Sequence, residues 1–198
     1  MSEMDAKSRR DFLKKSLLSL GGLYFYQSPI ISMNSRNRGV FKDEMIAGRT
    51  RLKSIKIEDV DTCFEREPLR ASFGFKGGYL SELWQSVSYL KASSGHHAIG
   101  LGTQSVLWSD AEIFSTYTES GGNALMYLLT ERALQLLRGS TYTSPMELID
   151  SLYEEIYRQG VKITGNTSLR KTFALNALVS VDNALWLLYA KEYGIRDF

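Results

Sequence analysis

The sequence is poor in the residue types that most often build covalently linked or metal-held folds. It has a single cysteine, Cys63, and only two histidines among its 198 residues. One thiol cannot form an internal disulfide bond, so a disulfide framework is excluded. Neither sign of charge dominates, because 24 Lys and Arg residues oppose 22 Asp and Glu residues. No basic stripe is interleaved with aromatic residues, so a nucleic acid is not expected as a partner.

Familiar catalytic combinations are also missing. No Ser-His-Asp set, Cys-His pair or cluster with metal-ligand spacing is evident in the sequence. The adjacent His96 and His97 would point to opposite faces of a strand, which favours histidines at the edge of a turn. A metal site built from these two histidines and Asp110 is the alternative. The residues alone therefore indicate a fold without a convincing catalytic centre, and no cofactor is expected in this chain.

The clearest positive feature is an export address at the N-terminus. A charged segment precedes an apolar run at 17–26, which is shorter than the roughly 20 residues that span ~30 Å of hydrocarbon. The residues that resemble a twin-arginine signal are Ser8, Arg9, Arg10, Phe12, Leu13 and Lys14. Such a signal implies the twin-arginine export machinery as a partner. It also implies a folded protein in the periplasm or elsewhere outside the cytoplasm, held at the membrane if the signal is uncleaved. A basic amphipathic N-terminus that touches membrane or nucleic acid is the alternative.

Composition divides the chain into three regions. Residues 1–35 are expected to be the signal peptide, and the polar, aperiodic residues 36–50 are expected to be a linker. Residues 51–198 form the remaining, folded part. That length is sufficient for one domain with a real hydrophobic core.

The first half of the folded part has the alternating pattern of strands. Apolar and polar residues alternate in 51–67, 79–95 and 96–108, and a change of phase near Asp59 suggests a bulge. Residues 66–78, between the first two strands, are rich in glycine. We expect a loop there rather than a tight hairpin.

The second half has the periodicity of helices. Asn123 is the expected N-cap of a first helix, and a third helix is expected over 168–193. Between them, Ser144, Pro145 and Glu147 form a capping box with proline at the first helical position. Three strands followed by three helices predict an α+β fold, in which a three-helix bundle packs on a three-stranded antiparallel meander.

Several short motifs have both a functional and a structural interpretation. Gly100 and Gly102 form no dinucleotide fingerprint, and we expect them to allow close approach of a neighbouring element. Residues 120–123 could bind an anion at a helix start or simply enter the helix. The acidic residues of 110–119 could ligate a cation or bind a cationic substrate, or be an ordinary acidic loop. Asp182 is expected to make a partly buried structural hydrogen bond or an N-cap contact rather than to act in catalysis.

Three longer stretches resemble one protein family. They are "EREPLRASFGFKGG" (65–78), "GHHAIGLGTQSVLWSD" (95–110) and "NALVSVDNALWLLYAKEYGI" (176–195). They resemble the N-terminal capping domain of the enolase superfamily, above all its mandelate racemase/muconate-lactonizing and dipeptide-epimerase branch. The resemblance implies a racemase, epimerase, lyase or cycloisomerase that removes a proton next to a carboxylate while Mg²⁺ stabilises the enediolate.

In that family the base and the metal ligands belong to a (β/α) barrel that follows the cap. Only four residues follow Gly194 in this sequence. We therefore expect the cap alone, truncated before the barrel, without catalytic or metal-binding residues and inactive by itself. The missing barrel and a small carboxylate substrate are the partners that the resemblance implies for the intact form.

The resemblance also gives a role to two expected loops, 66–78 and 108–122. In family caps such segments contact the substrate away from the reacting carbon, where they orient it and exclude water. The candidate residues in them are Phe73, Phe75, Lys76, Trp108 and Phe114. For the aromatic residues, packing under a long loop is the alternative.

A stand-alone exported binding or interaction module, derived from the cap, is the alternative function. With no barrel in place, the surface that faces it in the family would be exposed and apolar. Such a surface is a site for aggregation or for formation of a homo-oligomer.

Overall fold

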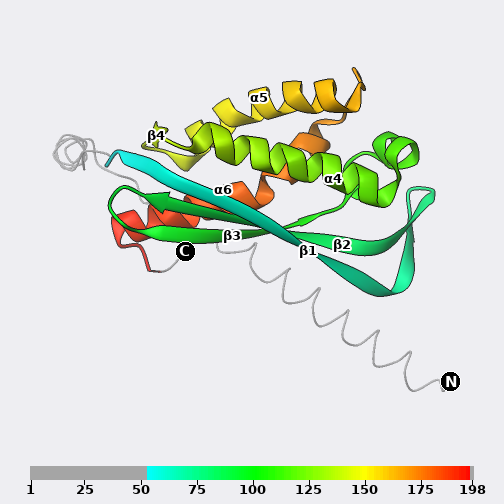
Figure 1. Cartoon of the computed structure of the whole chain (residues 1–198), viewed down its shortest axis with the longest axis horizontal. Coiled ribbons are helices and arrows are strands. Elements are labelled where there is room, and N and C mark those ends of the chain that lie inside the picture. Colours follow the sequence, from blue (N-terminus) through cyan, green and yellow to red (C-terminus); the bar gives the residue numbers. More distant parts are fainter. Residues whose placement is uncertain (1–52, 197–198) are drawn as a thin grey trace, which may run out of the picture. The chain divides into compact units, whose positions relative to one another are not determined.

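The structure, a computed structural model, describes residues 53–196 (Figure 1). The predicted signal, 1–35, and the predicted linker, 36–50, lie outside the described residues and stay predictions. The chain separates into two units, Met1–Thr50 and Arg51–Phe198. The description below concerns the second unit.

The strands form one antiparallel sheet. Its members are β1 (Ile55–Phe75), β2 (Gly78–Ala92), β3 (His97–Gln104) and β4 (Thr141–Tyr142), in the order β3-β2-β1-β4. Each neighbouring pair is antiparallel. The predicted three-stranded meander is therefore present, and a fourth strand joins its edge. That strand has only two residues, too few to show any period in the sequence.

The predicted loop at 66–78 is wrong, because β1 and β2 continue through it as a hairpin. Phe75 pairs with Gly78, and the two residues between them, Lys76 and Gly77, form the turn. Both have positive φ, 48° and 79°, as the tight two-residue turns of hairpins require. A register shift after Pro68 obscured the strand, since a bulge breaks the alternation on which the prediction rested.

The helices are α3 (Val106–Ser109), α4 (Ala111–Leu137), α5 (Pro145–Thr164) and α6 (Lys171–Tyr193). Helix α5 begins as predicted, with Ser144 as the N-cap. The loop predicted at 108–122 is wrong, because this segment belongs to α3 and to the first part of α4. Helix α4 bends at Thr118, where φ is 66° and ψ is 175°.

Helix α4 begins at a cap that the sequence pattern did not single out. Asp110 accepts hydrogen bonds from the backbone N–H groups of Glu112 and Ile113, which satisfies two of the free donors at a helix start. The predicted N-cap, Asn123, is instead buried within α4, and its side-chain oxygen accepts from the backbone N–H of Val106 at 2.8 Å. Because the helical backbone is interrupted at Thr118, residues 120–123 lie near the start of its second part rather than at an N-cap Asn123, and the anion interpretation stays a prediction.

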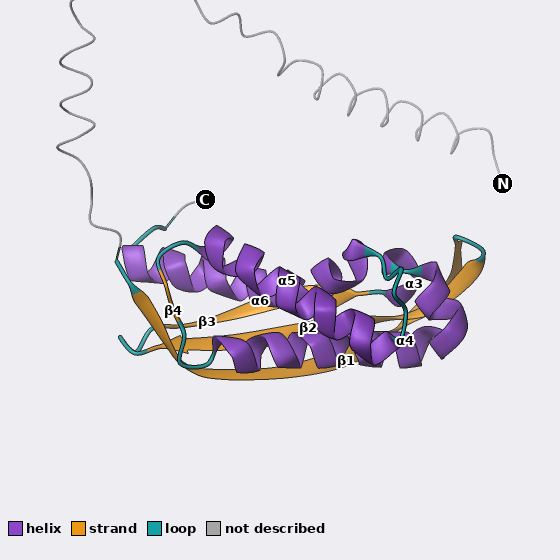
Figure 2. Ribbon diagram, turned by 90° about the horizontal axis from the view of Figure 1, so that it is seen from above, coloured by secondary structure: helices purple, strands orange, loops and turns teal. Residues whose placement is uncertain are grey.

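The helices and the sheet form two layers. Helix α6 contacts β2 and β3, α4 contacts β1 and β2, and the three long helices contact one another, as seen in Figure 2. The largest fully buried side chains are Phe173, Ile55, Ile57, Leu90, Leu107, Ile113, Met126, Leu129, Leu134, Leu137, Ile156 and Leu185. Helix α6 is long and apolar enough to cross a membrane, and here it supplies much of this core.

The two glycines of β3 allow a close contact between the layers. A Cβ on Gly100 would lie 2.0 Å from the backbone oxygen of Ser180, and a Cβ on Gly102 would lie 2.8 Å from its backbone nitrogen. The predicted close approach of a neighbouring element is confirmed, and that element is α6. Directly beside it, the buried hydroxyls of Ser88 and Ser180 are hydrogen-bonded at 2.8 Å.

Candidate functional site

The tip of the β1–β2 hairpin lies against α3 and the start of α4, at the end of the domain opposite β4 (Figure 1). Gly78, the first residue after the turn, is the point of contact. A Cβ there would lie 2.8 Å from the Phe114 ring and 3.1 Å from the Leu107 side chain. The two segments that the family resemblance singles out, 66–78 and 108–122, are therefore in direct contact.

Four of the five candidate residues form one aromatic–lysine cluster, which we define as Phe73, Phe75, Lys76 and Trp108. Phe75 stacks on Trp108 with ring centroids 4.8 Å apart and on Phe73 with centroids 6.3 Å apart. The Lys76 ammonium donates to the backbone oxygen of Trp108 at 2.9 Å. It also lies 5.2 Å from the centre of the Phe75 ring and 5.9 Å from that of Trp108, within the range of cation–π attraction.

The aromatic–lysine cluster faces solvent on one side. Phe73 is 56% exposed and Trp108 is 61% exposed. Phe114, by contrast, packs against the core beneath the turn, so it supports the tip. An ammonium group has three donors, and Lys76 gives one of them to Trp108. The arrangement is thus a flat apolar surface with a cation at its margin, which suits a ligand that carries a carboxylate beside an apolar group.

Behind the tip, two carboxylates connect β2 to α4 in a polar network that the sequence did not predict. Glu119 accepts from the backbone N–H of Ser81 at 2.9 Å and also from the Ser81 hydroxyl. Glu82 accepts two hydrogen bonds from Arg66, at 2.9 and 2.7 Å, and one from Ser120 at 3.1 Å. These bonds hold the hairpin beside the bend of α4, where Thr118 has its positive φ.

The charge of Glu82 is stabilised where it lies. Burial acts to raise the pKa of Glu82, but hydrogen bonds from Arg66, Trp84 and Ser120 outweigh burial and lower the pKa below its ordinary value. The indole N–H of Trp84 donates to Glu82 at 2.8 Å. Glu82 therefore stays ionised, and paired with Arg66, to a lower pH than an ordinary glutamate.

The histidines and Asp110 are not brought together. His96 pairs with the buried carboxylate of Glu192, at 3.2 Å, whereas Asp110 caps α4 beyond the far end of β3 and accepts from the backbone N–H of Arg170 at 2.9 Å. Within residues 53–196 no group of three or more His, Cys, Asp or Glu side chains could hold a metal ion. These residues therefore do not fit Mg²⁺, and no step through Mg²⁺ is assigned to them.

Glu192 also holds the first described residue of the chain in place. Its carboxylate pairs with the Lys53 ammonium and accepts from the Ser94 hydroxyl. The backbone N–H of Lys53 donates to the Tyr193 hydroxyl at 2.6 Å. Burial acts to raise the pKa of Glu192, but hydrogen bonds from Lys53, Ser94 and His96 lower it. This cluster fastens the start of β1 to the end of α6.

Asp182 lies half-buried on α6. Burial raises the pKa of its carboxyl, and a hydrogen bond with Trp186 opposes that rise. The expected structural hydrogen bond of Asp182 stays a prediction.

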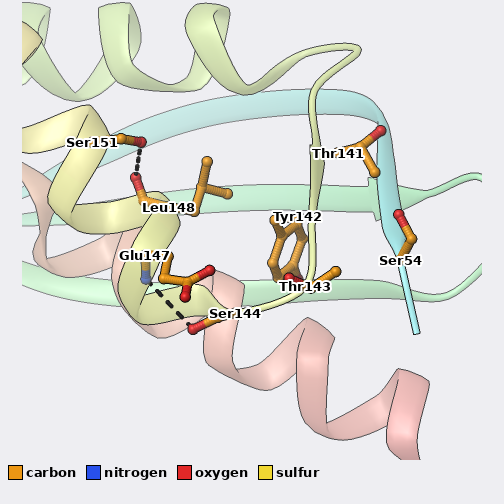
Figure 3. A pocket seen from close by; sticks show the side chains of 8 residues that line it. All are labelled: Ser54, Thr141, Tyr142, Thr143, Ser144, Glu147, Leu148 and Ser151. Carbon is orange, nitrogen blue, oxygen red and sulfur yellow. Dashed lines mark hydrogen bonds between the residues drawn. The ribbon is translucent and has the colours of Figure 1, made fainter. Parts of the chain in front are cut away.

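A polar pocket lies at the other end of the domain, where α5 begins (Figure 3). Its volume is about 340 Å³, and its lining includes Ser54, Thr141, Thr143, Ser144 and Ser151. Ser144 is occupied as the cap of α5 and Ser151 donates to the backbone oxygen of Leu148. The pocket is the N-terminus of a helix surrounded by hydroxyl groups, and nothing else in it points to a ligand.

No protein-family model and no curated protein matches the sequence. Among solved structures, the chain is similar to the L-talarate/galactarate dehydratase of Salmonella typhimurium LT2, with 19% identity, a TM-score of 0.47, and coverage of 72% of this chain and 32% of that one. It is also similar to a racemase from Streptomyces coelicolor A3(2), with 19% identity, a TM-score of 0.45 and coverage of 69% and 32%. A dipeptide epimerase from Enterococcus faecalis V583 has 17% identity, a TM-score of 0.41 and coverage of 70% and 32%.

These structural neighbours are members of the enolase superfamily, and all three structures contain magnesium or were crystallised with it. The chain spans about a third of the length of the solved structures that it matches. At such identities and TM-scores the likeness does not establish membership of the family. Family, activity and substrate therefore belong to the proposal that follows.

Proposed function

We propose that residues 53–196 are the capping domain of an enzyme of the enolase superfamily. The cap works with a catalytic (β/α) barrel that removes a proton next to a carboxylate with the help of Mg²⁺. No segment of residues 53–196 forms such a barrel, so base and metal ligands lie elsewhere. The cap contributes the binding of the substrate at a distance from the reacting carbon.

The observation that carries the proposal is the contact between the tip of the hairpin and α3. The stacking of Phe75 on Trp108 and the hydrogen bond from Lys76 to Trp108 join the two segments that family caps use for substrate contact. Phe73 and Trp108 supply an apolar wall, and Lys76 supplies a cation for a distal carboxylate or hydroxyl group. The binding energy of these remote groups orients the substrate.

The first test is the coding sequence beyond the codon for Phe198. We expect it to encode barrel strands with Lys-x-Lys and Asp-x-Asn or Asp-x-Asp patterns, in the same frame or after a single frame change. If no such strands follow, the capping proposal is wrong.

The second test is kinetic and uses the chain together with that continuation. Mg²⁺-dependent exchange of the proton next to the carboxylate is followed by NMR in D₂O, with glucarate and L-Leu-L-Tyr as the first substrates. Lys76→Met is expected to raise KM by about tenfold, the loss of roughly one charged hydrogen bond, with a smaller effect on kcat. Lys162→Met, at an exposed position of α5, is the matched control and should leave KM unchanged.

A stand-alone exported binding module is the second candidate function. It is favoured by the core, which is closed by elements of residues 55–188 alone. This candidate predicts that the 198-residue chain by itself binds a carboxylate saturably, measured by the quenching of Trp fluorescence, and that Lys76→Met weakens the binding. Binding by this chain without any barrel would favour the module over the cap.

Export through the twin-arginine pathway is part of the proposal for either function. It is supported by the order of residues 8–14, which lie outside the described residues. Replacing Arg9 and Arg10 by lysine should retain the protein in the cytoplasm, as shown by cell fractionation. An unchanged distribution would contradict this route.

A further inference from the structure

Two irregularities of the backbone are joined behind the hairpin tip. In the sheet, the pairing of β1 with β2 shifts so that residues 69–72 stand opposite Ser81 alone. In helix α4, the backbone leaves the helical region at Thr118. Glu119, the next residue, accepts a hydrogen bond from the backbone N–H of Ser81 at 2.9 Å. One carboxylate therefore connects the irregular part of the strand to the bend of the helix.

The backbone of Thr118 is strained. Its φ of 66° and ψ of 175° lie in a region that is essentially confined to glycine, and positive φ in a β-branched residue is an outlier. Among residues 53–196, Lys76 is the only other non-glycine residue with positive φ, and it lies in the hairpin turn, where such angles are ordinary. Strain of this kind persists only where the surrounding structure holds it.

Hydrogen bonds on both sides of Thr118 hold it in this conformation. Before it, the Tyr117 hydroxyl donates to the backbone oxygen of Thr164, at the end of α5, at 2.8 Å. After it, the Glu119 carboxylate accepts from both the backbone N–H and the hydroxyl of Ser81 on β2. The backbone at Thr118 cannot relax while both anchors are in place.

The anchor on β2 is the weaker of the two. The first part of α4 is fixed by the buried Ile113 and by Phe114 and Tyr117, which pack against the core. Ser81 is exposed and Glu119 is only half-buried, and exposed bonds of a carboxylate contribute little. A charged hydrogen bond and a strained residue are of similar free energy, so the closed arrangement is favoured by a small margin.

We propose that Thr118 is a strained hinge and that Glu119 is the catch that keeps it closed. When the bonds from Ser81 to Glu119 break, Thr118 relaxes into an ordinary conformation. The hairpin tip then turns away from α3 about the irregular residues 69–72, since a strand bends most readily at a bulge.

The release divides the aromatic–lysine cluster. Phe75 and Lys76 move with the hairpin tip, whereas Trp108 stays on α3, so the stacking of Phe75 on Trp108 and the bond from Lys76 to its backbone oxygen open together. The core beneath is unaffected, as expected for local opening of a unit with few buried contacts. The hinge concerns this chain by itself and does not rest on the proposed function.

Hydrogen exchange of the full chain, measured by NMR, tests the hinge at the backbone N–H of Ser81, which donates to Glu119. Thr118→Gly removes the strain from the closed arrangement, and we expect exchange at Ser81 to become about tenfold slower. Little else is lost, because the Thr118 hydroxyl accepts only a long bond from Gly121, at 3.4 Å, and glycine replaces threonine at a helix start at little cost.

Thr116→Gly is the matched control. It makes the same substitution at an exposed position two residues earlier, where φ is not positive. Glycine in a regular helix is destabilising, so exchange at Ser81 should be unchanged or faster. The hinge is overturned if Thr118→Gly fails to slow exchange at Ser81, or if Thr116→Gly slows it equally.

A double-mutant cycle tests whether Glu119 holds the strain. Glu119→Ala removes every bond to Ser81, after which Thr118 is free to relax. Thr118→Gly should therefore lower the equilibrium constant of unfolding about fivefold in the unchanged chain, but less than about twofold in Glu119→Ala. Urea denaturation followed by circular dichroism measures both constants.

Glu119→Gln keeps the shape of the side chain and serves as a milder second variant, in which the effect of Thr118→Gly should be intermediate. Spectra that match those of the unchanged chain will show that each variant is folded. An equal effect of Thr118→Gly with and without the Glu119 carboxylate would overturn the proposal, because the strain would then be held by other parts of the fold.

Discussion

The hairpin tip and the middle of β3 hold neighbouring elements together in opposite ways. At the tip, exposed side chains make the contact: aromatic rings stack, an ammonium group bonds to a backbone oxygen, and carboxylates behind them accept hydrogen bonds. In the middle of β3, the backbone of α6 lies directly on Gly100 and Gly102. At the tip, single side chains can be substituted without displacing the backbone. At Gly100 and Gly102, no flexible side chain lies between the strand and the helix, so an added side chain must displace backbone atoms.

This difference separates stability from recognition within one small domain. Overpacking a close contact between backbones lowers the free energy of unfolding by about 1–3 kcal/mol or more, whereas the loss of one exposed pair lowers it by about 0–1 kcal/mol. Under the proposed function, the tip can therefore change its side chains, and with them the ligand that it contacts, while the packing of α6 on the sheet stays as it is. Binding residues on a rigid support keep their geometry, which is what a site for substrate orientation needs.

The largest effect on stability is expected from a substitution at Gly100, in the contact between β3 and α6. Gly100→Ala is expected to lower the free energy of unfolding by about 3 kcal/mol or more, because its Cβ would meet the Ser180 oxygen at 2.0 Å and overpacking of this kind costs typically 1–3 kcal/mol. Urea denaturation followed by circular dichroism measures the change. Gly121→Ala is the control, since its Cβ would meet nothing nearer than 3.5 Å. If Gly100→Ala lowered the free energy of unfolding no more than Gly121→Ala does, the structural role of the glycines of β3 would be contradicted.

A smaller effect is expected behind the tip, at Glu82. Glu82→Gln keeps the shape of the side chain but removes its charge, and we expect a loss of about 1 kcal/mol at neutral pH. Because the folded pKa of Glu82 is lowered, the stability that its charge contributes is fully present above the unfolded value. That stability is lost as the pH falls through the folded pKa, below 4.5.

The resonance of the Trp84 indole N–H, which donates to Glu82, reports this titration directly by NMR. In the unchanged protein it should shift as the pH falls below 4.5, and in Glu82→Gln that shift should be absent. Arg66→Met, which removes the two charged hydrogen bonds, should move the transition to higher pH. A transition that stays in place without Arg66 would show that the pair does not hold the hairpin.

Elements with a regular period could be predicted from the sequence. The α+β class, three of the strands, the start of α5 at Ser144 and the course of α6 all follow from patterns within a few neighbouring residues. The function of Gly100 and Gly102 was predictable as well, because a glycine inside a strand has few other uses. The family resemblance pointed to Phe75, Lys76 and Trp108, and the structure brings these three residues together.

The missed features depend on contacts between distant parts of the chain. The hairpin through 66–78 is strand only because β2 pairs with it across a bulge, and glycines and Pro68 hide its alternation. The first part of α4 has polar residues and glycines of poor helix propensity. Gly122 lies so close to Val106 that a Cβ on it would meet the Val106 side chain at 2.5 Å, a contact between separate elements that no local pattern shows. The bond between Glu119 and Ser81 joins residues 38 positions apart, and no local pattern announces it.

The bonds from Lys53 to Glu192 and Tyr193 hold the first and the last parts of the described domain next to each other. The side chains of Lys53, Glu192 and Tyr193 join the first strand to the last helix. The order of the elements along the sequence can therefore be permuted without changing how they pack. A short peptide between residues 196 and 53 would close the chain into a ring, and the turn at Gly95, where β2 passes to β3, could then serve as the new opening. The sheet and its covering helices would be the same in such a permuted chain, because no strand pairing runs through either point.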